Sequence, residues 1–281
     1  MRGRVLIIAG SDSGGGAGLQ ADLKTVAALG GFGMTAVTAL TAQNTLGVQA
    51  VFPVPIAFLE QQLASVLSDL GADTIKTGML HSVEVVTAVA QAIRGLGSTV
   101  KVVVDPVMIA KGGASLLAAE AKASVLRELC PLAHVITPNA PEAEALTGLA
   151  VRNHADQLLA GEALCRMGAG HALIKGGHLE GATVTDVLVS ADGTNHTWSS
   201  PRLKTRSTHG TGCTLASAIA TLLAQGESVQ EAVRLARVYV LEAIAQAPGL
   251  GQGHGPLNHG WLNSLTAIRE TLERKAVRSS D

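Results

Sequence analysis

Small and polar residues near position 210 lead into an apolar segment. Gly210 and Gly212 flank Thr211. Cys213 comes next, and the run 215–224 has the length and composition of a helix. The first turn of such a helix has backbone N–H groups without intrahelical partners, together with the positive end of the helix dipole. Glycines there let an anion approach the backbone, so this segment predicts a cradle for a phosphate or carboxylate.

The alternative for this segment is purely structural. It would be a glycine-rich turn leading into a buried helix, with Cys213 as a small core residue. A short glycine motif does not by itself separate these two interpretations.

Further polar residues stand at the ends of predicted strands. They are Gly10 to Asp12, Gln43, Lys76 and Thr77, Asp105, Asn139 and Lys175. Each has a structural alternative, since Asp105 can close a turn, Asn139 can form an Asx turn and Lys175 can be an ordinary strand-end lysine. Ligands bind beyond the carboxyl ends of strands in open α/β sheets, so the shared position favours one site. An anion cradle, a lysine and carboxylates suited to magnesium describe phosphoryl transfer from a nucleotide, although no Walker sequence is present.

The elements that must position these residues alternate between strands and helices. Strands are predicted at 5–8, 35–40, 74–77, 101–104, 135–137 and 172–175, with an edge segment at 48–54. Helices are predicted at 19–29, 56–70, 82–93, 118–129, 141–146, 156–167, 215–224, 229–247 and 265–275. The segments 184–190 and 196–199 form a late β-hairpin. This order predicts one α/β domain with a mainly parallel sheet.

Composition excludes several classes of protein. The chain has 281 residues, of which 47% are hydrophobic and 15% charged, and its net charge is -1, which argues against nucleic acid as a partner. The apolar run 5–9 is too short for a signal peptide, and no later run is long enough to span a membrane. Three widely spaced cysteines suit a reducing compartment, so we expect a cytoplasmic protein. The glycine spacing at 14–18 does not fit a dinucleotide-binding fingerprint.

Several motifs follow one another in register from about Val5 to Trp261. They are AGSD and GGGAGLQADLKT within 9–25, TALTAQNT at 38–45, KTGML at 76–80, DPVM at 105–108, TPNAPE at 137–142, KGGH at 175–178, HGTGCTL at 209–215 and GPLNH at 255–259. This series resembles the hydroxymethylpyrimidine and phosphomethylpyrimidine kinases of thiamine biosynthesis, which belong to the ribokinase-like superfamily. The resemblance implies a single three-layer domain over residues 1–281, with 262–281 as a C-terminal helical tail.

The resemblance also implies an activity. The γ-phosphoryl group of ATP would pass to the hydroxymethyl group of 4-amino-5-hydroxymethyl-2-methylpyrimidine, and a second transfer would act on the resulting monophosphate. ATP and Mg²⁺ are the cofactors that it implies.

Site residues follow from the same resemblance, motif by motif. The pyrimidine pocket would contain Gly10, Asp22, Gln43, Met79 and Val107, with Gln43 reading the aminopyrimidine edge. ATP would be bound by Lys175, Asn139 and Glu142, and magnesium by Glu142 and Asp105. The transferring phosphoryl group would be held by the catalytic segment Gly210, Thr211, Gly212 and Cys213.

Cys213 stands where ribokinase-like enzymes generally have an aspartate base. A thiol at a helix N-terminus can have a lowered pKa and accept the proton of an alcohol. A neutral thiol would, in addition, avoid repelling a phosphate acceptor. We therefore expect Cys213 to permit both transfers in one site.

Two alternatives to this function remain open. One is a kinase of the same fold that acts on pyridoxal or related vitamin B6 alcohols. The other is a non-catalytic sensor that binds the pyrimidine or a nucleotide without turnover. The oligomeric state is also open, with a homodimer among the assemblies considered.

Overall fold

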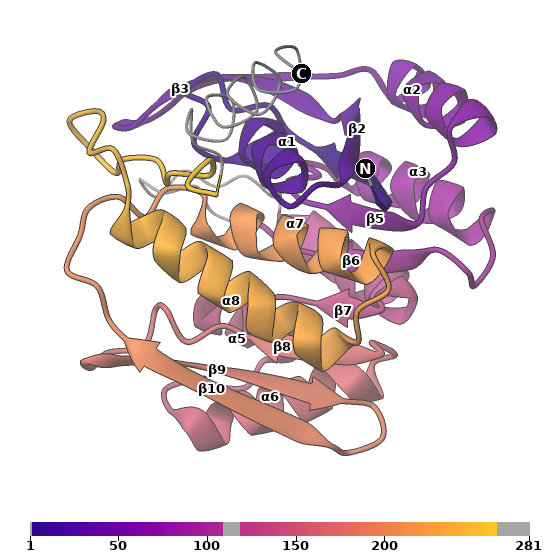
Figure 1. Cartoon of the computed structure of the whole chain (residues 1–281). Coiled ribbons are helices and arrows are strands. Elements are labelled where there is room, and N and C mark those ends of the chain that lie inside the picture. The colour runs from indigo at the N-terminus through magenta and orange to yellow at the C-terminus, as the bar shows by residue number, and fades with distance from the viewer. Residues whose placement is uncertain (1, 109–118, 263–281) are drawn as a thin grey trace, which may run out of the picture.

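A twisted eight-stranded sheet forms the middle layer of the computed structural model, which describes residues 2–108 and 119–262 (Figure 1). Its spatial order is β10 (Asn195–Pro201), β9 (Thr183–Ser190), β8 (His171–Ile174), β7 (Val135–Ile136), β6 (Lys101–Val104), β5 (Thr74–Thr77), β1 (Arg4–Ala9) and β2 (Phe32–Val37). Neighbouring strands from β2 to β8 are parallel, whereas β8, β9 and β10 pair antiparallel. The expected parallel sheet and late hairpin are confirmed. The helix predicted at 265–275 lies outside the described residues.

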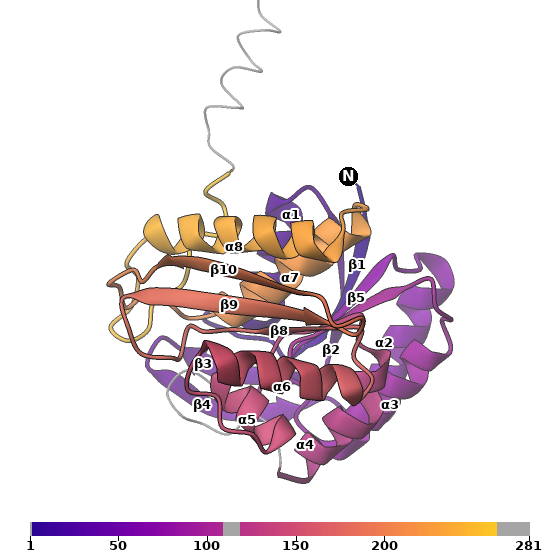
Figure 2. The same cartoon turned by 90° about the horizontal axis from the view of Figure 1, so that it is seen from below.

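Helices cover both faces of this sheet (Figure 2). One face carries α1 (Gly18–Ala28), α7 (Thr211–Ala224) and α8 (Val229–Ala245). The other carries α2 (Ile56–Asp69), α3 (Val83–Arg94), α4 (Ala119–Ser124) with its π-helical and 3₁₀ continuations (Val125–Leu129 and Cys130–Leu132), α5 (Ala140–Thr147) and α6 (His154–Arg166). Side chains of β1 alternate between the two resulting cores, with Leu6 and Ile8 in one and Val5 and Ile7 in the other. The continuous apolar run at 5–8 is thus a strand buried on both faces.

No helix within 2–108 and 119–262 has both the length and the apolar composition needed to cross a membrane.

The region after β2 differs from the predicted strand at 35–40. β2 ends at Val37, and β3 (Ala39–Asn44) pairs with β4 (Gly47–Pro53) in a separate two-stranded antiparallel sheet. Between β2 and β3, the buried Thr38 donates its N–H to Ala9 O, and its carbonyl oxygen accepts from the N–H of Val54. A run of β-forming residues does not reveal such a change of partner, because its local composition is the same on both sides of Thr38.

Helix starts fall into two kinds. Ser82, Asn139, Asn153 and Ser228 cap α3, α5, α6 and α8, each accepting a hydrogen bond from a first-turn backbone N–H. The start of α7 has no side-chain cap, and its N-cap is Gly210 in the left-handed conformation with φ 82°. The first turn of α7 is therefore free to donate to something other than its own chain.

Candidate active site

A cavity of about 570 Å³ lies at the carboxyl ends of the parallel strands, against the start of α7. All site residues predicted from the sequence line it except Asp22 and Thr77. Those lining it are Gly10, Gln43, Met79, Asp105, Val107, Asn139, Glu142, Lys175, Gly210, Thr211, Gly212 and Cys213. The fold therefore brings together, at one edge of the sheet, residues that are far apart in the chain.

The start of α7 has no room for a side chain at Gly210 and little room at Gly212. A Cβ at Gly210 would overlap the carbonyl oxygen of Gly16, and its positive φ also favours glycine. A Cβ at Gly212 would lie 3.2 Å from Lys175 Nζ. These close approaches set the uncapped turn of α7 directly beside a lysine, which is the arrangement that binds an anionic group such as a phosphate.

Lys175 is held between two carboxylates. Its Nζ donates to Asp105 Oδ1 at 3.0 Å and lies 4.0 Å from Glu142 Oε2. Burial alone would lower the pKa of Lys175, but the negative charges of Asp105 and Glu142 outweigh it and raise the pKa above its ordinary value. The lysine thus stays charged and can neutralise phosphate oxygens.

Asn139 and Glu142 form a capping box at the start of α5. Asn139 Oδ1 accepts from the N–H of Glu142 at 3.0 Å, and Glu142 Oε2 accepts from the N–H of Asn139 at 2.8 Å. The structural alternative for Asn139 is correct in this respect, yet both residues also line the cavity. Burial raises the pKa of Glu142 to about 7, against the opposing effect of Lys175.

The acidic residues fit magnesium in combination with a nucleotide. Among the described residues, no group of three or more His, Cys, Asp or Glu side chains is arranged to hold a metal ion. Asp105 and Glu142 nevertheless flank the same lysine within the cavity. Magnesium is commonly held by one or two carboxylates plus phosphate oxygens and water, so two oxygen donors here suit it.

Asp22 lies behind the cavity wall, whereas the sequence analysis places it in the pyrimidine pocket. Its carboxylate is fully buried, accepts from Lys76 Nζ at 2.8 and 3.0 Å, and accepts from Ser217 Oγ of α7 at 2.7 Å. Lys76 itself lines the cavity. Burial would lower the pKa of Lys76, but the charge of Asp22 outweighs burial and raises it. Asp22 thus joins α1, β5 and α7 and fixes a positive charge at the cavity wall.

Cys213 does not have the lowered pKa expected from its place at a helix N-terminus. Burial raises the pKa of this thiol to about 12, although the neighbouring Lys76 acts in the opposite direction. Loss of water around the sulfur therefore outweighs the helix dipole and the nearby cation. At neutral pH, Cys213 presents a neutral thiol to the cavity.

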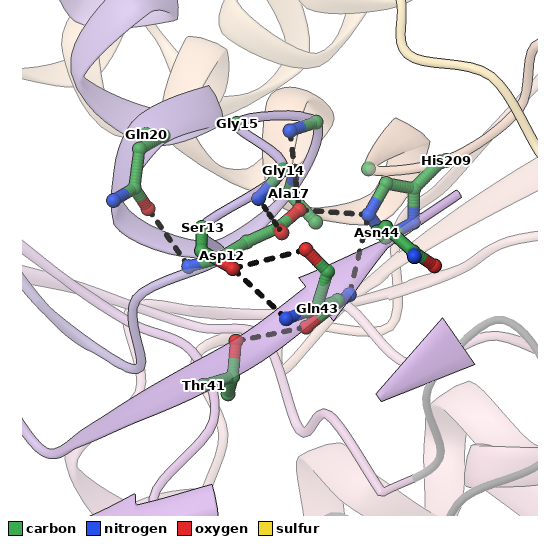
Figure 3. Close-up of polar contacts among 12 residues, drawn as sticks. Asp12, Ser13, Gly14, Gly15, Ala17, Gln20, Thr41, Gln43, Asn44 and His209 are labelled. Atoms are coloured by element: carbon green, nitrogen blue, oxygen red, sulfur yellow. Dashed lines mark hydrogen bonds and ion pairs between the residues drawn. The ribbon is translucent and has the colours of Figure 1, made fainter. Parts of the chain in front are cut away.

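Gly10, Met79 and Gln43 also line the cavity. A Cβ at Gly10 would overlap the terminal methyl of Met79, so the glycine lets the Met79 side chain lie across the end of β1. Gln43 follows a register shift in β3, and such bulges redirect side chains. Its carboxamide lies near Thr41 on the same strand and near His209, which precedes the α7 cradle (Figure 3).

Asp12 and His209 form a buried pair that the sequence analysis does not predict. Asp12 Oδ2 lies 2.8 Å from His209 Nε2, and its two carboxylate oxygens accept from the N–H groups of Gly14, Gly16 and Ala17. Burial would raise the pKa of Asp12, but these hydrogen bonds together lower it. Both residues lie within motifs of the family series, but they are 197 positions apart, so the sequence does not indicate that they are in contact.

Comparisons with known proteins show which family this chain resembles. The chain is 51% identical over 259 residues to the thiamine biosynthesis bifunctional protein ThiED of Geobacter sulfurreducens, covering 92% of this chain and 52% of that protein, so it spans about half of that relative. It is 49% identical to the hydroxymethylpyrimidine/phosphomethylpyrimidine kinase of Bacillus subtilis, covering 95% of this chain and 98% of the relative.

The fold also matches a solved structure. An ADP complex of Bacillus subtilis pyridoxal kinase superposes with a TM-score of 0.86 and 37% identity, covering 93% of this chain and 99% of that chain. The ribokinase-like fold expected from the motifs is confirmed by this likeness. The sequence pattern of the family described as phosphomethylpyrimidine kinase matches residues 12–258. The chain therefore belongs to the phosphomethylpyrimidine kinase family.

Proposed function

We propose that this protein uses ATP to phosphorylate 4-amino-5-hydroxymethyl-2-methylpyrimidine and then phosphorylates the monophosphate to the diphosphate. The observation that carries the proposal is the uncapped start of α7 beside the Lys175, Asp105 and Glu142 cluster, in a cavity that also contains Gln43. The name of the Geobacter sulfurreducens relative supports thiamine biosynthesis as the setting, and the name of the Bacillus subtilis relative supports the two phosphorylations.

The phosphate groups would lie between α7 and Lys175. The N–H groups of the α7 first turn would donate to the transferring phosphoryl group, and Lys175 would neutralise its charge. Asp105 and Glu142 would hold magnesium, which supplies charge neutralisation and orients the phosphates. Catalysis would then consist of positioning and electrostatic stabilisation.

A neutral Cys213 suits both acceptors. Phosphoryl transfer proceeds through a loose transition state with little covalent chemistry for the protein, so an alcohol acceptor does not require a strong base. The second acceptor is a phosphate that carries its own charge. A carboxylate about 4 Å from it, at an effective dielectric constant of about 20, would be repelled by about 4 kcal/mol for each charge pair. The raised pKa of Cys213 removes that repulsion.

A direct assay tests the proposed function. Purified protein is given ATP, Mg²⁺ and one acceptor at a time: the pyrimidine alcohol, its monophosphate, or pyridoxal. We expect ADP release with the first two and a much lower kcat/KM with pyridoxal. Higher turnover with pyridoxal would favour the vitamin B6 alternative. Binding of the pyrimidine without ADP release would favour the sensor.

A further inference from the structure

Gln43, His209 and Asp12 form a polar chain in the wall of the cavity, with their side chains directed toward one another (Figure 3). His209 Nε2 lies 2.8 Å from Asp12 Oδ2 and 3.3 Å from Gln43 Nε2. Asp12 and His209 are buried, with exposed fractions of 2% and 7%. Buried polar atoms need compatible partners, so the direction of each hydrogen bond in this chain matters.

The bond between His209 and Asp12 has one direction. Asp12 accepts three backbone N–H groups, which stabilise an ionised carboxylate, and such a carboxylate can only accept. His209 Nε2 must therefore carry a hydrogen and donate it to Asp12. A ring nitrogen that carries a hydrogen has no lone pair left to accept one from Gln43.

The same reasoning applies to Thr41 on the other side of the carboxamide. Thr41 Oγ1 donates its single hydrogen to Ser11 O at 2.8 Å. It also lies 3.2 Å from Gln43 Oε1, so the two oxygens have no second hydrogen to share. When Nε2 points toward His209, two hydrogen-bond donors face each other. When Oε1 points toward Thr41, two oxygens face each other without a hydrogen between them.

A half-turn of the carboxamide removes both conflicts. The exchange of Oε1 and Nε2 leaves the shape of the side chain unchanged. Oε1, an acceptor, then faces His209 Nε2 at 3.3 Å while the single hydrogen of that nitrogen stays donated to Asp12, and Nε2 donates to a lone pair of Thr41 Oγ1. Each amide atom keeps one further hydrogen-bonding position, an acceptor on the side of His209 and a donor on the side of Thr41.

We propose that Asp12 and His209 are positioning residues that fix the orientation of the Gln43 carboxamide and so select an aminopyrimidine edge. This inference rests on the proposed function. An aminopyrimidine presents an amine donor next to a ring-nitrogen acceptor, which pairs with the fixed acceptor and donor of Gln43. The amine then lies on the side of His209 and the ring nitrogen on the side of Thr41. A carboxamide that rotates freely would present its acceptor and donor in the matching order only part of the time.

The test is a double-mutant cycle between His209 and Gln43. His209→Leu, Gln43→Leu and the double variant are compared with wild type for pyrimidine binding by calorimetry and for KM and kcat. We expect each single variant to weaken pyrimidine binding about tenfold, since each leaves a polar partner unpaired. The double variant should be no weaker than Gln43→Leu alone, whereas KM for ATP should change less than twofold. Additive losses, or an equal rise in the KM for ATP, would overturn the inference.

Two further variants keep the test valid if His209→Leu folds poorly. His209→Gln carries an N–H near the position of Nε2 and should restore pyrimidine affinity to within about threefold of wild type. Thr41→Val removes the acceptor for Nε2 and should weaken binding about threefold in wild type but not in Gln43→Leu. His254→Leu is the matched control, because His254 is exposed in the loop after α8. Failure of His209→Gln to restore binding, together with additive Thr41→Val and Gln43→Leu, would reject the inference.

Failure of the proposed function gives a different result. In that case, wild-type protein would neither bind nor phosphorylate the pyrimidine alcohol, and the inference would fall with it. If the wild-type protein phosphorylates the pyrimidine alcohol but the losses of the variants are additive, the inference is overturned and the proposed function stands.

Discussion

Helices α5 and α7 begin at the same cavity but in opposite ways. α5 satisfies its first N–H groups with Asn139 and Glu142, and this capping box leaves a carboxylate at the cavity. α7 begins at a left-handed Gly210 without a side-chain cap. One start therefore presents negative charge and the other presents N–H donors, with Lys175 between them. The contrast indicates that a helix start presents a carboxylate or N–H donors according to whether its own side chains occupy those donors.

The largest expected effect comes from giving the α7 start a side chain. Gly210→Ala must relieve the overlap with Gly16 O and adopt a strained φ. Because small displacements of positioning groups are costly, we expect kcat/KM to fall at least about a hundredfold. Stability should fall by about 1–3 kcal/mol, measured by denaturant unfolding. Gly95→Ala is the control, since Gly95 has φ -69° and an added Cβ would make only ordinary contact. An active Gly210→Ala would contradict the cradle.

Making α7 resemble α5 is the second test. Cys213→Asp places a carboxylate at the α7 start, where it repels a phosphate acceptor more than an alcohol. We expect the second transfer to lose about a hundredfold more activity than the first, measured separately for each step. Cys213→Ala should lower both steps by less than about tenfold, because a neutral thiol is not the base. Equal losses in the two steps for Cys213→Asp would contradict the role of charge repulsion. A selective loss of the first step for Cys213→Ala would show that Cys213 acts as a base.

The third test separates the two roles of Glu142. Glu142→Gln keeps the capping box but removes the charge, whereas Glu142→Ala loses both. Both should raise the Mg²⁺ requirement about tenfold, since a carboxylate ligand is absent. Only Glu142→Ala should lose about 1 kcal/mol of stability, measured by thermal unfolding. Pyrimidine binding without ATP should be nearly intact in both variants. Its loss would show that Glu142 serves the pyrimidine and not the nucleotide with its magnesium.

The raised pKa of Glu142 adds a pH signature to that test. Its pKa is about 7 in the folded protein and 4.5 in the unfolded chain. Between these two pH values Glu142 is therefore protonated more fully in the folded state than in the unfolded state. The Glu142 contribution to stability should therefore decline as the pH rises from 4.5 to about 7. Mg²⁺ should bind more weakly as the pH falls through about 7 in wild type, and Glu142→Gln should lack this dependence.

The smallest effect is expected at a cap remote from the chemistry. Ser228 caps α8 by accepting from the N–H of Glu231 at 3.2 Å. Ser228→Ala should cost about 1 kcal/mol and lower Tm by about 2–4 °C, measured by calorimetry. Its kcat/KM should equal that of wild type. A large loss of activity would mean that helix caps in general, and not the contrast between α5 and α7, govern the site.

Sequence predicts the parts of this molecule that depend on local pattern. The buried run at 5–8 and the polar residues after each parallel strand indicated the sheet and its active edge, because parallel strands align their carboxyl ends. The family motifs supplied the candidate residues, most of which line the cavity. The change of partner at Thr38 was missed, because both neighbouring segments favour strands equally.

The missed features all depend on tertiary surroundings. Asp22 was assigned to the pocket, but the face of α1 that it occupies turns it toward Lys76 and Ser217. Cys213 has a raised pKa because of burial, which spacing does not reveal. Asp12 and His209 meet only after the whole sheet is assembled.

The contact between Gly210 and Gly16 also bears on synthesis of the chain. β1 and its following loop emerge from the ribosome long before α7, whose first turn completes the cradle. Strands β1 to β8 are all synthesised before the first turn of α7. Binding competence can therefore arise only late in translation, when the last third of the polypeptide returns to a loop made at the beginning.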